Sequence, residues 1–345
     1  MVVTLDDTKR LAIAGKLADM KAIQNLIISN EQQLIQAIND EDIRKRLRDF
    51  LEDDQKNMGV LDTVIVQYGV KGEPKETTQQ LVEQVQKMMQ GSELTLLEKF
   101  AQHELLKHKQ TMTGLLIHKC AQVVGADVMA AISPLNTVNF ENRAHQEQLK
   151  GILEIIGTRE LTGQEPDQGL WGRVQDAVAA LSGVVGSAVT QTSDMSDMTI
   201  GQILRMDHSK ARTLFMEIQS SNDPQKIQEY FGQLYKDLMA HAKAEEQVVY
   251  PAVRSYYKDT QDLYNEQAEQ ARMLDEIKSM SPSSPQFKDK VKQLMDATNH
   301  HINQEENEML PKLDSNLSSE QQQQLATQFK SAKSQLQDQM AASSK

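Results

Sequence analysis

The stretch HINQEENEMLP, residues 301–311, carries a histidine and a glutamate four residues apart, followed by a proline. The stretch HAKAEEQVVYP, which begins at His241, has the same order. Aligned on their prolines, the two stretches superpose His241 on His301 and Glu245 on Glu305. Residues four apart on a helix lie on one face, one turn apart. Each histidine and glutamate pair therefore points to a single side of its own helix.

Both pairs continue an apolar stripe. In the predicted helix at 224–256 the line of apolar residues leads to the first pair, and in the helix at 284–311 it leads to the second. The predicted helix at 200–220 places His208 on the same line as Leu204. Apolar residues at this spacing mark the face that packs into a core. The sequence therefore predicts that imidazoles and carboxylates face the interior of a helical bundle.

Buried imidazoles and carboxylates without partners would cost more free energy than a marginally stable domain can lose. A shared cation removes this cost, and facing helices of a bundle are a known place for two-metal carboxylate sites. A lone buried histidine is more often a satisfied core residue, but matched pairs in two helices favour a metal. We expect a pair of irons, with manganese or zinc as alternatives. The expected ligands from these stripes are His208, His241, Glu245, His301 and Glu305.

The order MDHSK, then HAKAEEQVVYP, then HINQEENEMLP resembles the hemerythrin-like HHE cation-binding domain over about residues 200–315. The resemblance implies a four-helix bundle that holds two irons, with Glu245 and Glu305 as candidates to bridge them. The segment NEQAEQARML departs from the family pattern, because Gln270 stands where the third helix usually has a histidine. Glu266, one turn earlier, is the strong substitute ligand, and whether Glu266 or Gln270 fills the place stays open.

The composition predicts an all-α protein. Leu, Ala, Gln, Glu, Lys and Met dominate, aromatic residues make up 4% of the chain, and strict strand-like alternation is rare. A length of 345 residues suits two domains of about 100–200 residues each. We expect two antiparallel helical bundles, at 1–158 and at 200–330. Residues 159–199 are expected to form a linker with a small-residue helix at 178–189, and residues 331–345 a frayed tail.

Net charge and cysteine content limit the possible binding partners and the cellular location of the protein. A net charge of −12 and the lack of a basic stripe predict no nucleic-acid partner. Cys120 is the single cysteine, and neither a secretion signal nor a membrane span is recognisable, so we expect a cytoplasmic protein. The small side chains at 178–189 allow close approach of backbones, so a homo-oligomer stays open.

The N-terminal helices carry a second, weaker set of inward polar residues. The predicted helix at 93–126 places Leu97, Met112 and Leu115 on one stripe together with Glu104 and His108. The full set of titratable residues on the predicted inward lines is Glu31, Asp54, Glu104, His108, Glu141 and His145. Whether these residues form a second metal site, or hydrogen-bond to one another without metal, stays open.

The segments NEQQLIQAI, FLEDDQKNMGVLDTVIVQYG and AQHELLKHKQ, followed by CAQVVG, resemble the ferritin-like superfamily and its YciF-type members over about residues 20–157. The resemblance implies a ferritin-like N-terminal bundle. The spacing differs from the Glu-x-x-His of ferritin-like di-iron sites, because the chain offers Asp54-x-x-Asn57 and a Glu and His pair at 104 and 108.

Three functions follow as hypotheses. The first is a non-haem di-iron protein that handles dioxygen, peroxide or iron itself, in sensing, scavenging or storage during stress. The second is a structural or stress-protecting scaffold in which a metal only stabilises the fold. The third is a ferroxidase that uses the N-terminal bundle. No phosphate loop or nucleophile elbow is present in the sequence, so a conventional transferase or hydrolase is not expected.

Overall fold

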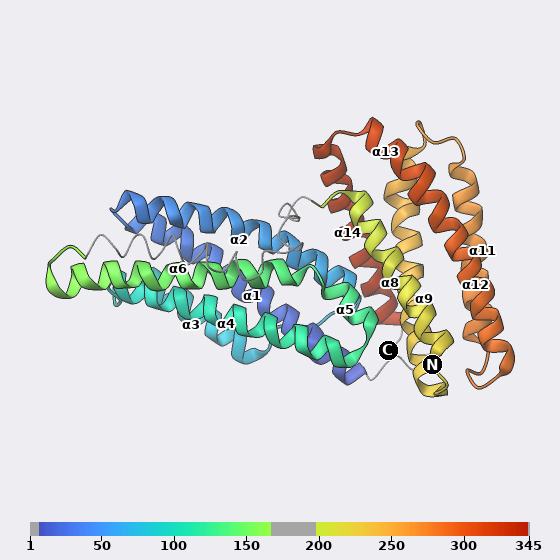
Figure 1. The fold of residues 1–345 in the computed structure, drawn as a ribbon, viewed down its shortest axis with the longest axis horizontal. Coiled ribbons are helices and arrows are strands. Elements are labelled where there is room, and N and C mark those ends of the chain that lie inside the picture. Colours follow the sequence, from blue (N-terminus) through green and yellow to red (C-terminus); the bar gives the residue numbers. More distant parts are fainter. Residues whose placement is uncertain (1–6, 167–197, 344–345) are drawn as a thin grey trace.

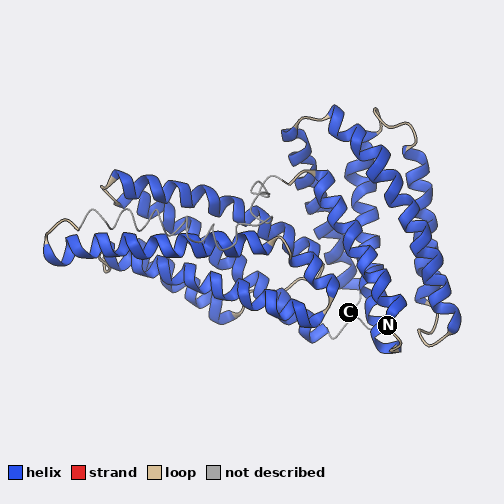
Figure 2. Cartoon of the chain, in the orientation of Figure 1, coloured by secondary structure: helices blue, strands red, loops and turns tan. Residues whose placement is uncertain are grey.

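The computed structural model describes residues 7–166 and 198–343, and these residues form helices and connecting turns without a strand (Figure 2). The all-α prediction is confirmed for this part of the chain. The predicted small-residue helix at 178–189 lies outside the described residues. The preceding helix reaches Thr162, which is inside the segment expected to be a linker.

The N-terminal bundle is elongated (Figure 1). Its helices are α1 (Asp7–Ala37), α2 (Glu41–Tyr68), α3 (Glu76–Gln90), α4 (Leu96–Val124), α5 (Ala126–Ile132) and α6 (Leu135–Thr162). Local capping sets several ends: the Asp40 side chain accepts backbone N–H bonds at the start of α2, and Thr95 with Glu98 forms a capping box on α4. Gly69 ends α2 in the left-handed region at φ 75°.

The C-terminal bundle stands across one end of the first (Figure 1). Its helices are α8 (Ile200–Ser220), α9 (Pro224–Ala244), α10 (Tyr250–Val253), α11 (Thr260–Lys278), α12 (Pro285–Gln304), α13 (Leu310–Asn316) and α14 (Ser319–Ser343), with π-helical turns η2 (Glu245–Val249) and η3 (Glu305–Met309). Helix α14 packs beside α9 and η2 as an additional helix. It continues to Ser343, beyond the point where a frayed tail was expected.

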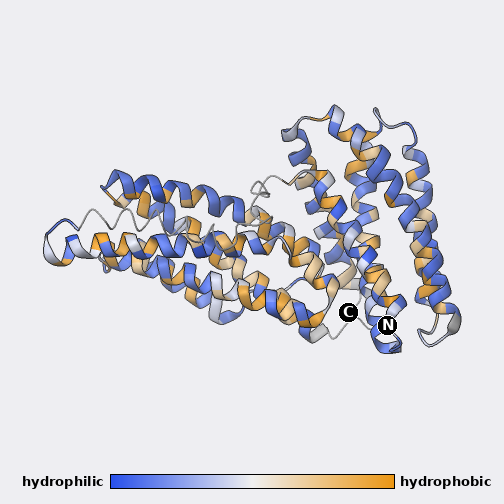
Figure 3. Cartoon of the chain, in the orientation of Figure 1, coloured by the Kyte–Doolittle hydropathy of each residue, from blue (hydrophilic) through white to orange (hydrophobic). Residues whose placement is uncertain are grey.

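Buried apolar residues form the cores of both bundles, and hydrophilic residues occur along much of the ribbon when it is coloured by hydropathy (Figure 3). Helix α4 is turned differently from the sequence prediction. Its buried face includes Phe100, His103 and Lys107, whereas Met112 is 53% exposed and Leu115 is 47% exposed. Apolar residues occur around the whole circumference of α4, so periodicity alone does not select one face. The packing of α4 against α1 and α6 makes that choice.

A buried lysine joins the two bundles. The Lys210 ammonium on α8 donates to the backbone carbonyls of Gln67 at 2.7 Å and Tyr68 at 3.2 Å, where α2 ends. The same ammonium lies 2.9 Å from Asp237 on α9. Carbonyls at a helix C-terminus lack intrahelical partners and carry partial negative charge, so a cation suits this position. Lys210 of the C-terminal bundle therefore offsets the partial negative charge at the end of α2 in the N-terminal bundle.

Replacing this lysine with an apolar residue of similar length tests the junction. We expect Lys210→Met to lower the free energy of unfolding by about 3 kcal/mol, because Asp237 and two carbonyls would remain buried without the ammonium. Urea unfolding followed by circular dichroism measures the loss. The exposed Lys292 on α12 gives the control, and Lys292→Met should change the stability by less than about 0.5 kcal/mol. Equal effects of the two substitutions would contradict the role of Lys210.

Candidate metal centre

The two matched sequence stretches take the same unusual backbone. Helices α9 and α12 each widen into a π-helical turn that begins at the glutamate, Glu245 or Glu305. Tyr250, the residue before Pro251, donates its backbone N–H to the carbonyl of Glu245, five residues earlier. A proline inside an α-helix lacks an N–H and crowds the carbonyl four residues back, and the wider turn accommodates both effects. The shared proline thus marks the place where each helix turns its glutamate inward.

Three imidazoles surround the two glutamates in the core of the bundle. His241 Nε2 lies 3.1 Å from Glu245 Oε2, and His208 Nε2 lies 3.2 Å from Glu305 Oε2. His301 Nε2 lies 3.3 Å from Glu305 Oε1. Both glutamates are fully buried. One ligand atom from each of His208, His241, Glu245 and Glu305 lies within 4.8 Å of the others, the only such group of histidine, cysteine or acidic residues among the described residues.

Each imidazole has its second nitrogen held by a different carboxylate. The pairs join Nδ1 of His208 to Glu306 at 2.8 Å, Nδ1 of His241 to Asp207 at 2.8 Å, and Nδ1 of His301 to Glu266 at 2.7 Å. An N–H donated from Nδ1 leaves the Nε2 lone pair free to face the centre, which is the arrangement of metal-bound histidines. All three histidines therefore have the same orientation, with Nδ1 at an outer carboxylate and Nε2 toward the centre.

Helix α14 extends this outer layer. Lys333 on α14 lies 2.5 Å from Asp207, and the ring of Phe329 lies edge-on to His241 at 5.8 Å between centroids. The ammonium keeps Asp207 ionised, because it overcomes burial and holds the pKa of the carboxyl well below its usual range. Asp207 is therefore a permanent acceptor for the N–H of His241.

Without a metal ion, the charges of the centre are balanced by protons. Burial raises the pKa of Glu245, and the neighbouring Glu305 raises it further. Burial also acts on Glu305, but His301 and His208 outweigh it and hold its pKa well below the usual value. Burial alone would lower the pKa of His241, yet Glu245 and Asp207 raise it to about 10. Protons on the histidines thus supply the positive charge that a metal ion would otherwise bring.

The donor set fits a metal ion. Glu245 Oε1 is buried without a hydrogen bond, and the buried atoms His208 Nε2 and Glu305 Oε2 lie 3.2 Å apart without hydrogen-bonding geometry. Such unsatisfied buried atoms are uncommon in proteins and call for a missing partner. Carboxylate oxygen with neutral imidazole nitrogen suits iron, manganese and zinc. The residues present are therefore compatible with the cation that the sequence predicted.

The inward-facing residues of α11, the third helix of the bundle, differ from the sequence prediction. Glu266 lies on the outer side of His301 rather than in the centre. Gln267, which the predicted stripe did not include, donates to Glu245 at 2.7 Å and to the Tyr250 hydroxyl at 2.5 Å. Tyr250 in turn donates to Glu305 at 2.7 Å. The signal for Tyr250 was present, since it precedes Pro251 in the quoted stretch.

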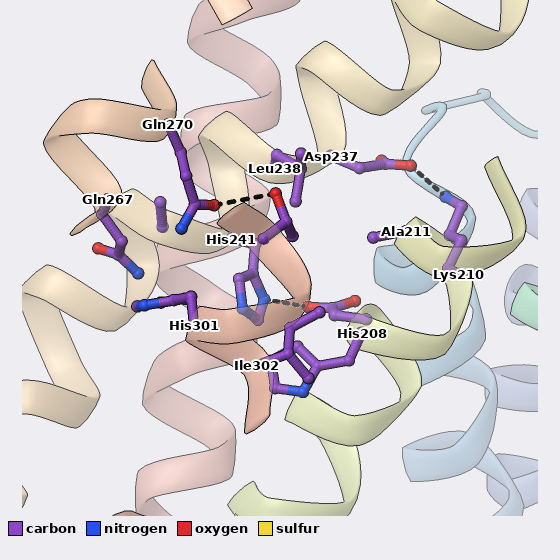
Figure 4. A pocket seen from close by; sticks show the side chains of 13 residues that line it. His208, Lys210, Ala211, Asp237, Leu238, His241, Gln267, Gln270, His301 and Ile302 are labelled. Carbon is purple, nitrogen blue, oxygen red and sulfur yellow. Dashed lines mark hydrogen bonds and ion pairs between the residues drawn. The ribbon is translucent and has the colours of Figure 1, made fainter. Parts of the chain in front are cut away.

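A small cavity adjoins the imidazoles (Figure 4). Its volume is about 30 Å³, and Gln270 and Thr298 are among the residues that line it. The Gln270 amide nitrogen has no hydrogen-bond partner. The cavity extends to Lys210 and Asp237 at the junction of the bundles. A space of this size holds about one or two water-sized molecules, so a nucleotide does not fit beside the centre.

The polar residues of the N-terminal bundle form a different arrangement. Glu31, Asp54 and His145 meet in the interior, as predicted, but around the ammonium of Lys107. Glu104 and His108 do not join them and instead contact Gln146. Glu141 is partly exposed, and burial raises its pKa.

Comparison with known proteins agrees with this geometry. Residues 199–313 match the hemerythrin HHE cation binding domain family. Over 342 residues the chain is 64% identical to a protein of Nostoc sp. (strain PCC 7120) named DNA nickase, covering 99% of this chain and 97% of that one. The chain belongs to the same family as that protein, and its C-terminal bundle is a hemerythrin HHE cation-binding domain.

A second match is more distant. An uncharacterized hemerythrin-like protein of Schizosaccharomyces pombe is 29% identical over 142 residues, which is 39% of this chain and 68% of that protein. No solved structure matches the chain. The ferritin-like resemblance of the N-terminal bundle therefore stays a prediction.

The prediction that nucleic acid is not a partner is wrong. The Nostoc protein is similar along nearly the whole chain, and its name states an action on DNA. The prediction rested on a net charge of −12, which is a sum over the entire chain. Contact with phosphates depends on local charge, so a negative sum does not exclude it. No helix of the described residues is long and apolar enough to cross a membrane.

Binding of a cation at this cluster should release protons. The pKa of His301 is raised to about 9, because its carboxylate neighbours outweigh the opposing effect of burial, and that of His241 is raised to about 10. Both imidazoles are protonated near neutral pH, so a cation that takes Nε2 must displace a proton, and its apparent affinity should fall as the pH is lowered. Calorimetric titration with Zn²⁺ in two buffers of different ionisation enthalpy counts the released protons. Binding without proton release would contradict the protonation of these histidines.

Proposed function

We propose that the C-terminal bundle binds a pair of iron ions, which His208, His241, His301, Glu245 and Glu305 would hold. The observation that carries this proposal is the repeated orientation of the imidazoles, each with Nδ1 bound to a carboxylate and Nε2 directed to the buried glutamates. An iron pair supplies one-electron and two-electron chemistry with small oxidants when it is bound. The protein is then a non-haem iron protein that handles dioxygen or peroxide.

The residues around the centre determine what reaches it. The cavity admits only small molecules, and the unpaired Gln270 amide borders it. Asp207, Glu266 and Glu306 accept the Nδ1 N–H of the three imidazoles and so keep Nε2 directed to the centre once its proton has left. Tyr250 donates to Glu305 Oε1 and Gln267 donates to Glu245 Oε2, which leaves Glu245 Oε1 and Glu305 Oε2 without a hydrogen bond. Glu266 therefore acts as a positioning residue, and the third helix leaves open space where Gln270 lies.

The iron proposal is tested with two adjacent histidines. His301 is buried in the centre, whereas the side chain of His300 is 77% exposed. We expect purified protein to contain about two irons per chain, and His301→Ala to lose most of this iron while His300→Ala retains it. Metal analysis and the visible absorption of the protein measure both effects. Retention of iron in His301→Ala, with the fold intact, would exclude His301 as a ligand.

A second candidate function is single-strand nicking of DNA. The similarity to the Nostoc DNA nickase along 99% of this chain favours it. The buried centre does not admit a phosphodiester in the observed conformation, because the cavity volume is about 30 Å³. Nicking by this protein therefore proceeds at another surface or through a small molecule that leaves the centre.

Relaxation of supercoiled plasmid tests the DNA function and its dependence on the metal. At low salt, where phosphate contacts are strongest, we expect the iron-loaded protein to convert supercoiled DNA to open circles. His301→Ala should lose most of this activity, and His300→Ala should keep it. Equal nicking by both variants would show that the centre takes no part, and no nicking by the loaded wild-type protein would remove the second candidate.

A further inference from the structure

The interior of the N-terminal bundle contains a lysine in surroundings that resemble a metal site. The ammonium of Lys107 on α4 contacts the carboxylate of Asp54 and lies 3.5 Å from Glu31 Oε1 and 3.1 Å from His145 Nδ1. Lys107, Asp54 and Glu31 are all completely buried. The nearest neighbours of this nitrogen are thus two carboxyl groups and an imidazole, which are ligand types for divalent cations.

The imidazole is oriented as a ligand. His145 Nε2 lies 3.2 Å from Asp53, while Nδ1 faces Lys107. Because an ammonium only donates, Nδ1 must present its lone pair, and Nε2 carries the N–H that Asp53 accepts. The same pattern holds each histidine of the C-terminal centre, with the two ring nitrogens exchanged. In both bundles a carboxylate therefore orients an imidazole, so that its other nitrogen faces buried glutamates in the C-terminal centre and a buried ammonium in the N-terminal bundle.

Glu31 and a further imidazole, His103, lie together in this pocket without hydrogen bonds. His103 Nε2 lies 3.2 Å from Glu31, yet both nitrogens of His103 and both carboxyl oxygens of Glu31 are buried without a hydrogen bond. Burial lowers the pKa of His103 to about 3, so its ring is neutral. Burial and the nearby Asp54 raise the pKa of Glu31 well above its usual value, which favours the protonated carboxyl. The pocket therefore contains ligand-type atoms that one ammonium does not satisfy.

We propose that the N-terminal bundle contains a divalent-cation pocket in which Lys107 takes the place of the ion. The ammonium is tethered to α4 and supplies the positive charge at a fixed point, so the wild-type pocket takes no metal. Shortening the lysine removes the charge and opens the space that its side chain fills. Asp54, Glu31 and His145 would then bind one divalent ion, with His103 within reach of Glu31 as a further donor.

Cobalt and zinc titrations of the full-length protein test this assignment. Lys107→Ala should bind one more Co²⁺ per chain than the wild type, detected by equilibrium dialysis and by the visible cobalt bands. Saturating Zn²⁺ should raise the melting temperature of Lys107→Ala by about 5 °C more than that of the wild type. Lys107→Met is the matched control, because it removes the charge but keeps the side-chain volume, and it should gain neither the ion nor the zinc stabilisation.

Each outcome decides the proposal. Loss of the additional cobalt in Lys107→Ala/Asp54→Asn, with no change in the cobalt count for Asp54→Asn alone, supports it. A fall in the cobalt count on Asp54→Asn alone would show that the wild-type pocket already binds metal, and would overturn it. So would a folded Lys107→Ala variant that binds no more cobalt than Lys107→Met. If Lys107→Ala folds only with Zn²⁺, the ion has replaced the ammonium, whereas failure to fold even with Zn²⁺, when Lys107→Met folds, counts against the pocket.

Discussion

Buried carboxylates set the main constraint on this structure. Glu245 and Glu305 lie side by side in the C-terminal core, and Glu31 and Asp54 lie together in the N-terminal core, all fully buried. A pair of carboxylates in a low-dielectric interior is stable only with protons, ammonium groups or metal ions to balance it. In the C-terminal bundle, histidines suited to a metal surround the glutamates. In the N-terminal bundle, the ammonium of Lys107 lies beside the carboxyl groups. The two bundles therefore balance buried carboxylates with different positive groups.

The balance of charge in the C-terminal bundle depends on parts of the chain outside the three helices that carry the imidazoles and glutamates. Helix α14 supplies Lys333, which holds Asp207, which in turn holds His241. Helix α14 also contacts the N-terminal bundle, because Lys330 donates to Thr63 at 3.2 Å and Gln337 donates to the carbonyl of Val66 at 3.1 Å. The orientation of one imidazole is therefore linked through a single helix to the surface of the other bundle.

The size of the cavity limits which molecules reach the centre, and therefore which candidate functions it can serve directly. An enclosed site with space for about one or two water-sized molecules suits reactions of small oxygen species. The relative with 64% identity is named for an action on DNA, a polymer far larger than this cavity. Because the glutamates are buried, DNA does not reach the centre in the observed conformation. A reaction on DNA that depends on the centre therefore needs either a small molecule that diffuses from the centre to the DNA or a change in the structure that exposes the centre.

The sequence by itself determined the helical class and the matched pairs of the C-terminal bundle. Spacing of four residues and apolar stripes are local properties of a helix, so they place His241 with Glu245 and His301 with Glu305 before any packing is known. The positions of His208 and of both glutamates in one cluster followed the same stripes.

Only the tertiary structure decided the remaining features. Lys107 and His103 face the core because α4 packs on α1 and α6, and the apolar residues of α4 do not favour one side. The outer carboxylates were not predictable, because Asp207 meets Lys333 across 126 residues and Glu266 meets His301 across 35. Periodicity describes one helix at a time, whereas the balance of buried charge depends on side chains that only folding brings together.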